Sequence, residues 1–251
     1  AASMLFTGCS KKAESKVPDK LIVGTNAEFP PFEYMNDKKQ PEGFDIAMIK
    51  EIGKRMGKKV EIKNMEFKSL IGAMESDSIN AIIAGMTKTE KREKAVDFSD
   101  SYYTTNQAII LKKDSKITKL AQLDGKKIGV QEGTTGDLIS SGDKFGDGKK
   151  AKVLVKGAKV KRFKKGVDAV MDLKNGSVDA VVIDELTANE FVKKNAKKLK
   201  IVIDSAGSEY YCIALTKGNT AYKEEVNKQI KAIKEDGTYD KLKAKYIDSK
   251  N

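Results

Sequence analysis

Short runs of apolar residues alternate with amphipathic stretches from residue 20 onward, and this alternation limits the choice of fold more than any other feature of the chain. Residues 21–23 and 81–84 are typical of buried strands. Between them, apolar residues three or four positions apart predict a helix with Asp45 as its N-cap and Gly57 just after its end. Strands that alternate with helices along a chain predict an α/β fold.

The same periodicities predict the remaining elements. Thr87 and Glu90 have the spacing of a capping box, which predicts a short helix that carries Arg92. Further helices are expected at residues 69–75, 166–173, 185–193, 221–235 and 239–246. Further strands are expected at residues 60–65, 107–111, 127–130, 153–155, 180–183, 200–203 and 211–215.

The composition excludes several classes of function. The chain has no His and therefore no imidazole base or imidazole metal ligand. Cys9 and Cys212 are its two cysteines, and they lie too far apart in the sequence for a CxxC motif. We therefore predict neither a metal nor a cofactor. The formal net charge is +12, but Lys is spread among acidic residues, which predicts a solvated Lys-rich surface and no nucleic-acid partner.

The first ten residues are small or apolar up to Cys9, and a polar stretch follows. They are similar to the end of a bacterial lipoprotein signal, in which a cysteine is lipidated, although Phe6 stands where an aliphatic residue is usual. We therefore expect residues 1–19 to be a signal remnant and a flexible linker, with a lipid on Cys9 as the membrane anchor. The alternative is an accidental free thiol.

Two junctions between a strand and a helix have the features of anion sites. Residues 133–136 (Gly-Thr-Thr-Gly) follow one predicted strand, and residues 84–87 (Ala-Gly-Met-Thr) follow another, with Arg92 one turn beyond. Backbone N–H groups at such junctions attract anions, and a guanidinium binds a carboxylate with two hydrogen bonds. Asp184 ends a further strand and is either an acceptor for an ammonium group or the N-cap of the next helix.

Phe29 and Phe67 follow predicted strands and lie in predicted loops. Aromatic residues in these places either fill the core or contact the side chain of a ligand.

Together these motifs closely resemble those of the polar amino acid-binding proteins of bacterial ABC importers, solute-binding protein family 3. The resemblance covers about residues 21–246 and rests on residues 25–34, 43–45, 65–67, 84–89, 92, 96–99, 133–135 and 179–184.

The resemblance implies the type II periplasmic-binding-protein fold. In this fold two α/β lobes, each with a mostly parallel sheet flanked by helices, close on one amino acid. The lobes would comprise residues 20–103 plus 211–251 and residues 104–210, with two hinge strands near residues 102–106 and 206–210.

The resemblance also implies roles for residues at the backbone end of an amino acid. Arg92 would bind the ligand carboxylate, aided by the N–H groups of Thr87 and Thr135. Asp184, the Thr87 hydroxyl and the Gly85 carbonyl would receive the ligand ammonium.

Other residues would surround the ligand side chain. Phe29 and Phe67 would flank it, whereas Asn26, Met86 and Gln131 would line its distal end.

The sequence departs from the family pattern at the positions that select the side chain. Relatives with basic ligands often have a carboxylate at the position of Asn26, and glutamine-binding relatives tend to have Lys at Gln131 and His at Ile183. Glu28 is either the missing negative charge or a solvent-exposed residue.

The resemblance implies a non-enzymatic, monomeric receptor that delivers its ligand to the permease of an ABC importer. Arginine or lysine is the expected ligand, with glutamine and then cystine or cysteine as alternatives. The expected location is extracytoplasmic, on the outer face of the cell membrane or in the periplasm. A dehydratase on the same scaffold and the sensor domain of a receptor or channel are the rival functions.

Overall fold

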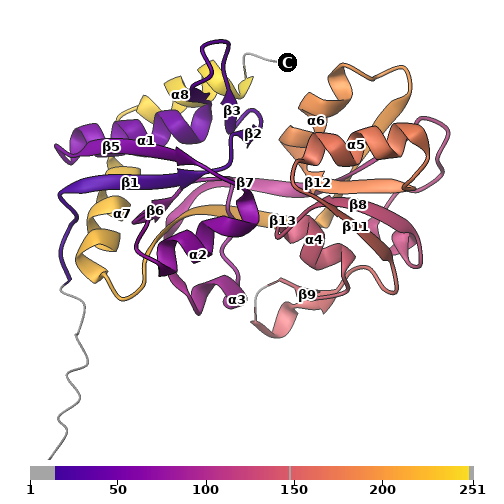
Figure 1. Cartoon of the computed structure of the whole chain (residues 1–251), viewed down its shortest axis with the longest axis horizontal. Helices are drawn as coiled ribbons and strands as arrows, with labels where there is room; N and C mark the ends of the chain where they lie inside the picture. Colours follow the sequence, from indigo (N-terminus) through magenta and orange to yellow (C-terminus); the bar gives the residue numbers. More distant parts are fainter. Residues whose placement is uncertain (1–14, 147, 249–251) are drawn as a thin grey trace, which may run out of the picture.

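Two long strands connect two lobes in the computed structural model, which describes residues 15–146 and 148–248 (Figure 1). These strands, β7 (Val96–Lys112) and β13 (Leu199–Thr216), pair with each other in the middle of an eight-stranded sheet. The order along the sheet is β11 (Lys159–Phe163), β8 (Lys127–Gln131), β12 (Ala180–Asp184), β7, β13, β6 (Ala81–Ile82), β1 (Lys20–Thr25) and β5 (Lys59–Asn64). We call the half with β6, β1 and β5 lobe 1, and the half with β8, β11 and β12 lobe 2.

Lobe 1 is built around three parallel strands, because β1 pairs in parallel with both β5 and β6. A small antiparallel sheet extends it and contains β2 (Glu28–Phe29), β3 (Glu33–Met35) and β4 (Pro41–Glu42). Its helical elements are α1 (Phe44–Arg55), the short 3-10 helix η1 (Phe67–Ser69), α2 (Leu70–Glu75), α3 (Glu90–Glu93), α7 (Thr220–Glu235) and α8 (Thr238–Tyr246). Both ends of the sequence therefore contribute to lobe 1 (Figure 1).

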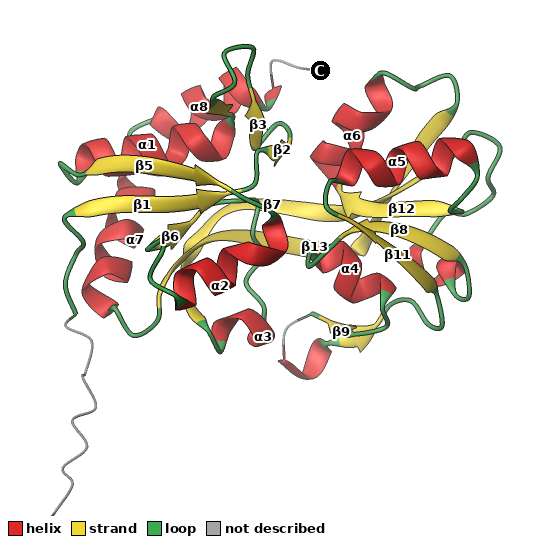
Figure 2. Ribbon diagram, in the orientation of Figure 1, coloured by secondary structure: helices red, strands yellow, loops and turns green. Residues whose placement is uncertain are grey.

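Lobe 2 repeats this plan, because β8 pairs in parallel with both β11 and β12. Its helices are α4 (Thr135–Ser140), α5 (Gly166–Asn175) and α6 (Glu185–Lys193), with short 3-10 helices η2 (Leu120–Leu123) and η3 (Gly148–Lys150). A two-stranded sheet of β9 (Lys144–Phe145) and β10 (Lys152–Val153) lies beside α4 (Figure 2).

Apolar side chains bury both faces of the sheet. One cluster contains residues of α1, α7, α5 and α6 and extends through both lobes, where Tyr102 and Tyr211 of the two connecting strands join its halves. A second cluster lies under η2 and α4 in lobe 2, and a third lies under α2 in lobe 1. Each buried Leu or Ile side chain contributes about 1.5–3 kcal/mol to stability, so each lobe has a substantial core of its own.

Two strands cross between the lobes, as predicted, and they are longer than the strands predicted from the sequence. The strand expected at residues 107–111 is the end of the 17-residue β7, and the strands expected at 200–203 and 211–215 are parts of the 18-residue β13. The pairing of β7 with β13 is irregular between Asp204 and Ser208, where the strands pass between the lobes. The middle of each strand is polar because it borders the cleft, which is why its sequence resembles a loop.

Two predicted helix caps are wrong. The N-cap of α1 is Gly43, whereas the carboxylate of Asp45 is buried and accepts hydrogen bonds from the Gly85 N–H at 2.7 Å and the Tyr102 hydroxyl at 2.8 Å. The N-cap of α3 is Thr89 rather than Thr87, and its hydroxyl accepts from the N–H of Arg92. In both cases a tertiary contact occupies the side chain that the local pattern had assigned to a cap.

The edge strand β11 was not among the predicted strands. Its sequence, Lys-Val-Lys-Arg-Phe, is mostly charged because an edge strand exposes much of its length to solvent.

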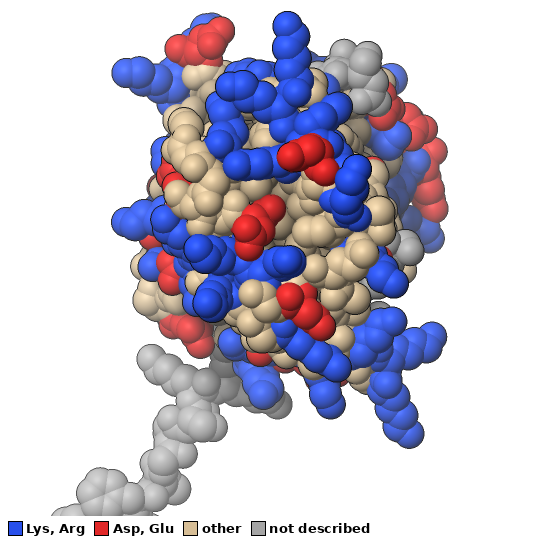
Figure 3. All heavy atoms as spheres, turned by 90° about the vertical axis from the view of Figure 1, so that its right-hand side faces the viewer, with Lys and Arg blue, Asp and Glu red and all other residues tan. Residues whose placement is uncertain are grey.

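The Lys-rich surface is evident at the outer end of lobe 2 (Figure 3). Residues 104–210 contain 22 Lys and Arg against 14 Asp and Glu. Lys112, Lys127 and Lys159 lie at the ends of β7, β8 and β11 that point away from lobe 1. Within the described part of the chain, no helix combines the length and the hydrophobicity of a membrane span.

Candidate ligand-binding site

The carboxyl ends of the parallel strands in the two lobes face each other across a cleft. Gln131 ends β8 of lobe 2, and its amide donates a 2.8 Å hydrogen bond to Asn26, which follows β1 of lobe 1. Asp184 ends β12 and is 3% exposed. In open α/β sheets, the carboxyl ends of strands are the usual place for a ligand.

A small cavity lies between the lobes. It has a volume of about 10 Å³, which is room for about one water molecule. Six of the predicted site residues are among those that line it: Phe29, Phe67, Gly85, Arg92, Thr135 and Asp184, together with Ala84 and Thr134. The structure therefore brings together residues from widely separated parts of the sequence, and the lobes are closed on one another.

Arg92 is a buried cation that connects both lobes. Its guanidinium donates to the Thr87 carbonyl of lobe 1 at 2.6 Å and to the Gly133 carbonyl of lobe 2 at 3.0 Å, and it lies 5.3 Å from the ring centroid of Phe67. Among the described residues, no carboxylate lies within ion-pair distance of Arg92, which is 7% exposed. Burial lowers its pKa to about 10, so the group keeps its charge at neutral pH. A guanidinium can bind a carboxylate with two hydrogen bonds, and a buried charge without such a partner is costly.

Asp184 is the N-cap residue of α6, but its side chain makes no capping hydrogen bond. Instead its carboxylate accepts from Gln107 Nε2 at 2.9 Å and from the Tyr211 hydroxyl. Burial, and then the neighbouring charge of Glu209, raise the pKa of Asp184 well above its usual value. An ammonium group in the cavity would compensate this buried acid.

Glu209 was not among the predicted site residues. It lies on β13 and is 1% exposed, and its Oε2 accepts from the hydroxyls of Thr135, at 2.7 Å, and Thr87. Its Oε1 accepts from Gln107 Nε2. The Thr87 hydroxyl therefore bonds to this carboxylate in the closed structure. One indication of this role was present in the sequence, because Glu209 is a charged residue within a strand that was expected to cross between the lobes.

The predicted distal end of the site is polar. Asn26 donates its amide N–H to the Met65 carbonyl at 2.8 Å and accepts from Gln131. Met86 is buried in the core of lobe 1 and lines a neighbouring cavity of about 270 Å³, with Phe67 and Arg92, rather than the central cavity.

Three Lys–Glu ion pairs connect the lobes around the cleft. They are Lys68–Glu132 at 2.9 Å, Lys164–Glu66 at 2.7 Å and Lys165–Glu28 at 2.8 Å. Glu28 is thus paired with a lysine of lobe 2.

A second buried acid pair lies behind Gly85. Both Glu33 and Asp45 are fully buried, and each carboxyl group shifts the pKa of the other. No N–H or O–H group of the described residues donates to Glu33, and a proton shared with Asp45 would satisfy both carboxyl groups. Because Asp45 also accepts from the Gly85 N–H, this pair fixes the backbone whose carbonyl is predicted to receive the ligand ammonium.

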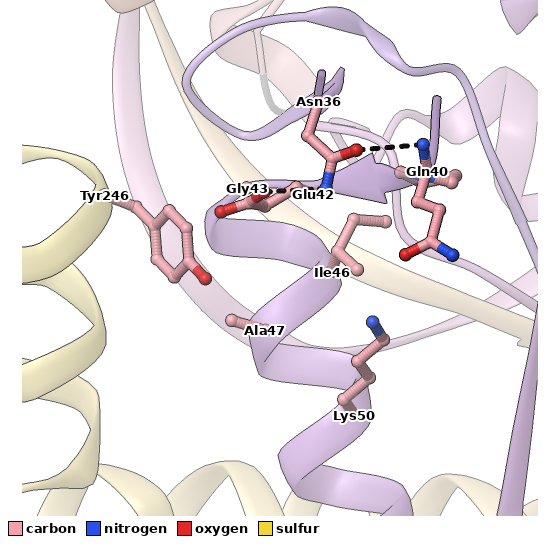
Figure 4. A pocket seen from close by; sticks show the side chains of 9 residues that line it. Asn36, Gln40, Glu42, Gly43, Ile46, Ala47, Lys50 and Tyr246 are labelled. Carbon is pink, nitrogen blue, oxygen red and sulfur yellow. Dashed lines mark hydrogen bonds between the residues drawn. The ribbon is translucent and has the colours of Figure 1, made fainter. Parts of the chain in front are cut away.

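Two other hollows lie outside the central cavity. One of about 180 Å³ lies beside α1 of lobe 1, where the Asn36 side chain bonds to Glu42 and to the N–H of Gln40 (Figure 4). These bonds close the β3–β4 hairpin, so the polar groups there have a structural role. A larger cleft of about 720 Å³ opens between α3 and the α4–β9 region, and Thr87 and Glu209 are among its lining residues. Within residues 15–146 and 148–248, no cluster of acidic residues and Cys is arranged to hold a metal ion.

Comparisons with known proteins agree with this geometry. The chain matches the family described as bacterial extracellular solute-binding proteins, family 3, over residues 21–249. It is 34% identical over 243 residues to the arginine-binding extracellular protein ArtP of Bacillus subtilis (strain 168), covering 96% of this chain and 91% of ArtP.

Solved structures confirm the two-lobed type II periplasmic-binding-protein fold. A structure of an ancestral arginine-binding protein bound to arginine has a TM-score of 0.81 and 41% identity, covering 92% of this chain and 100% of that chain. A structure of an ancestral arginine-binding protein bound to glutamine has a TM-score of 0.80, also with 41% identity, covering 92% and 99%. The chain belongs to family 3 of the bacterial extracellular solute-binding proteins.

Proposed function

We propose that this protein captures an L-amino acid between its two lobes, with arginine or lysine favoured, and delivers it to the permease of an ABC importer. The observation that carries this proposal is the pair of buried, opposite charges at one cavity. Within the part of the chain that the structure describes, Arg92 has no carboxylate and Asp184 no cationic group within ion-pair distance. The carboxylate and ammonium groups of a free amino acid would satisfy both. The family consists of solute-binding proteins, which supports a receptor rather than a dehydratase.

The proposed site residues keep the roles that the family resemblance implies. Arg92 and the N–H groups of Thr87 and Thr135 would hold the carboxylate, whereas Asp184 and the Gly85 carbonyl would hold the ammonium. The Thr87 hydroxyl would be available to the ligand only if its bond to Glu209 were exchanged.

The surroundings of the side chain support a cationic or amide ligand. Phe29 and Phe67 offer aromatic faces to a guanidinium or a methylene stem, and a cation over such a face gains about 0.5–2 kcal/mol. The oxygens of Asn26 and Gln131 are neutral acceptors at the distal end. The names of the relatives support the same choice, because ArtP is named for arginine and the ancestral structures hold arginine or glutamine. Glutamine is therefore the main alternative, followed by cystine or cysteine.

Ligand entry requires the lobes to separate, because the closed cavity of about 10 Å³ is far smaller than any amino acid. We place the lobe boundaries at residues 103/104 and 210/211, where Tyr210 pairs with Thr104 and Tyr211 pairs with Tyr103. The irregular pairing between Asp204 and Ser208 supports a hinge in this region.

The family places the protein outside the cytoplasm. Cys9 lies outside the described residues, and we propose on the sequence pattern alone that it is lipidated and holds the protein on the outer face of the membrane. Metabolic labelling with a fatty-acid analogue tests this, since Cys9→Ala should abolish the label.

A calorimetric titration with each of the twenty amino acids and cystine tests the proposed function. Arginine or lysine should bind most tightly. Small-angle scattering in the same series should show a protein that is at least as compact with ligand as without it. Binding of none of these ligands would refute the proposal, whereas tightest binding of glutamine or cystine would refute only the preference.

A further inference from the structure

Glu209 is a buried carboxylate that lines the larger cleft beside the central cavity, and groups from both lobes hold it, among them Thr135 of the cavity lining. Thr87 of lobe 1 and Thr135 of lobe 2 donate to the same oxygen, and Gln107 of β7 donates to the other. Burial raises the pKa of Glu209, while these hydrogen bonds and the charge of Arg92 oppose the rise. These donors show that the fold provides a specific site for the carboxylate rather than merely enclosing it.

The charges around the cavity do not balance. Arg92 faces two acids, because the charges of Asp184 and Glu209 both raise its pKa and its own charge lowers theirs. The acids at the rim have partners of their own, because Glu28 pairs with Lys165 and Asp137 pairs with Arg162 at 3.0 Å. Counted alone and all ionised, Arg92, Asp184 and Glu209 carry a net charge of about −1. Lys88, Lys91, Lys94 and Lys144 also line the larger cleft with Glu209.

We infer that Glu209 gives the site its preference for a cationic amino acid. The inference rests on the proposed function. A zwitterionic ligand satisfies Arg92 with its carboxylate and Asp184 with its ammonium, and adds no net charge. With a neutral ligand such as glutamine, the charge of Glu209 stays uncompensated in a buried site, which is unfavourable. The positive side chain of arginine or lysine compensates it.

When the ligand is neutral, Glu209 can lose its charge only by binding a proton. We therefore expect the protein to take up more protons when it binds glutamine than when it binds arginine. Calorimetry in two buffers of different ionisation enthalpy measures this difference directly.

The test compares the affinities of Glu209→Gln for arginine and for glutamine with those of the unaltered protein. Gln has the same shape as Glu and no charge, so the arginine-to-glutamine affinity ratio should fall at least tenfold. The difference in proton uptake between the two ligands should disappear. Glu185→Gln is the matched control, because Glu185 bonds to Asn106 at 3.1 Å outside the cavity, and its ratio should stay unchanged.

Glu209→Asp keeps the charge and shortens the side chain, so the ratio should persist even where both affinities fall. An equal loss for arginine and glutamine in Glu209→Gln would overturn the inference, since Glu209 would then only position the two threonines. An unchanged ratio would overturn it too, as would an unaltered protein that prefers glutamine, although amino acid binding would stand in both cases. Failure of the unaltered protein to bind any amino acid would overturn the proposed function and the inference together.

Discussion

Replacement of Arg92 by Ala tests the site most directly. The change removes the guanidinium that bonds to the carbonyls of Thr87 at 2.6 Å and Gly133 at 3.0 Å. It also removes the contact over the ring of Phe67. The desolvation of a buried charge disappears at the same time, which offsets the lost hydrogen bonds, so the melting temperature should change by only a few degrees.

The expected loss of affinity is much larger than the change in stability. Removing one partner of a buried, hydrogen-bonded charge pair costs about 2–5 kcal/mol. Since 1.4 kcal/mol is a factor of ten, the dissociation constant for arginine should rise roughly 30-fold to 4,000-fold. Arg92→Lys keeps the charge but loses the planar fork, so its affinity should lie between those of the unaltered protein and Arg92→Ala.

Isothermal titration calorimetry with the preferred amino acid measures these constants. Arg55→Ala is the matched control, because Arg55 lies on α1 and pairs with Glu51 and Asp236, both at 2.7 Å, away from the cavity. This control should bind as the unaltered protein does. A dissociation constant for Arg92→Ala within threefold of the original would refute the assignment of the ligand carboxylate to this guanidinium.

Three further changes test the surroundings of the site. Glu28→Gln combined with Glu66→Gln removes two ion pairs between the lobes, so scattering should show a larger radius of gyration without ligand; an unchanged radius would mean that these pairs do not hold the lobes together. Burial raises the pKa of Glu33, so the folded protein favours the neutral form of this side chain. The resulting stability is fully present below the unfolded-state pKa of about 4.3, and it is lost as the pH rises through the higher pKa of the folded state. Glu33→Gln cannot ionise and can always donate to Asp45, so the difference between its melting temperature and that of the unaltered protein should increase in its favour from pH 5 to pH 9. A difference that stays constant over this pH range would contradict the shared proton. Asn26→Asp should raise the arginine-to-glutamine affinity ratio by placing a charge at the distal end, and an unchanged ratio would show that the ligand side chain ends elsewhere.

The elements that the sequence predicted well are those whose burial is periodic. The helix at residues 185–193 buries Thr187, Ala188 and Val192, and the apolar run of β1 is largely buried, so local pattern and structure agree. β13 follows no such pattern near residue 209, because its buried residue Glu209 is charged whereas the neighbouring Tyr210 is an exposed aromatic residue. The strand β11 was not predicted for a related reason, since its charged residues face solvent at a sheet edge.

The site was predictable where a motif joined a backbone turn to a charged side chain. Arg92, Asp184 and Thr135 belong to such motifs, and the structure places all three at one cavity. Glu209 belongs to none, because its partners Thr87 and Thr135 are more than seventy positions away in the sequence. Only the closed arrangement of the lobes shows that this acid is buried.

Arg92 also indicates how capture and closure are coupled. Its bond to Thr87 lies within lobe 1 and persists when the lobes separate, whereas its bond to Gly133 crosses the cleft and exists only in the closed form. A ligand carboxylate on Arg92 in the open protein would gain the contacts of lobe 2, among them the Thr135 N–H, only on closure. A ligand shifts a conformational equilibrium only by its difference in affinity for the two states. In the proposed site, the contacts that lobe 2 adds would therefore be the ones that convert binding at Arg92 into closure of the protein.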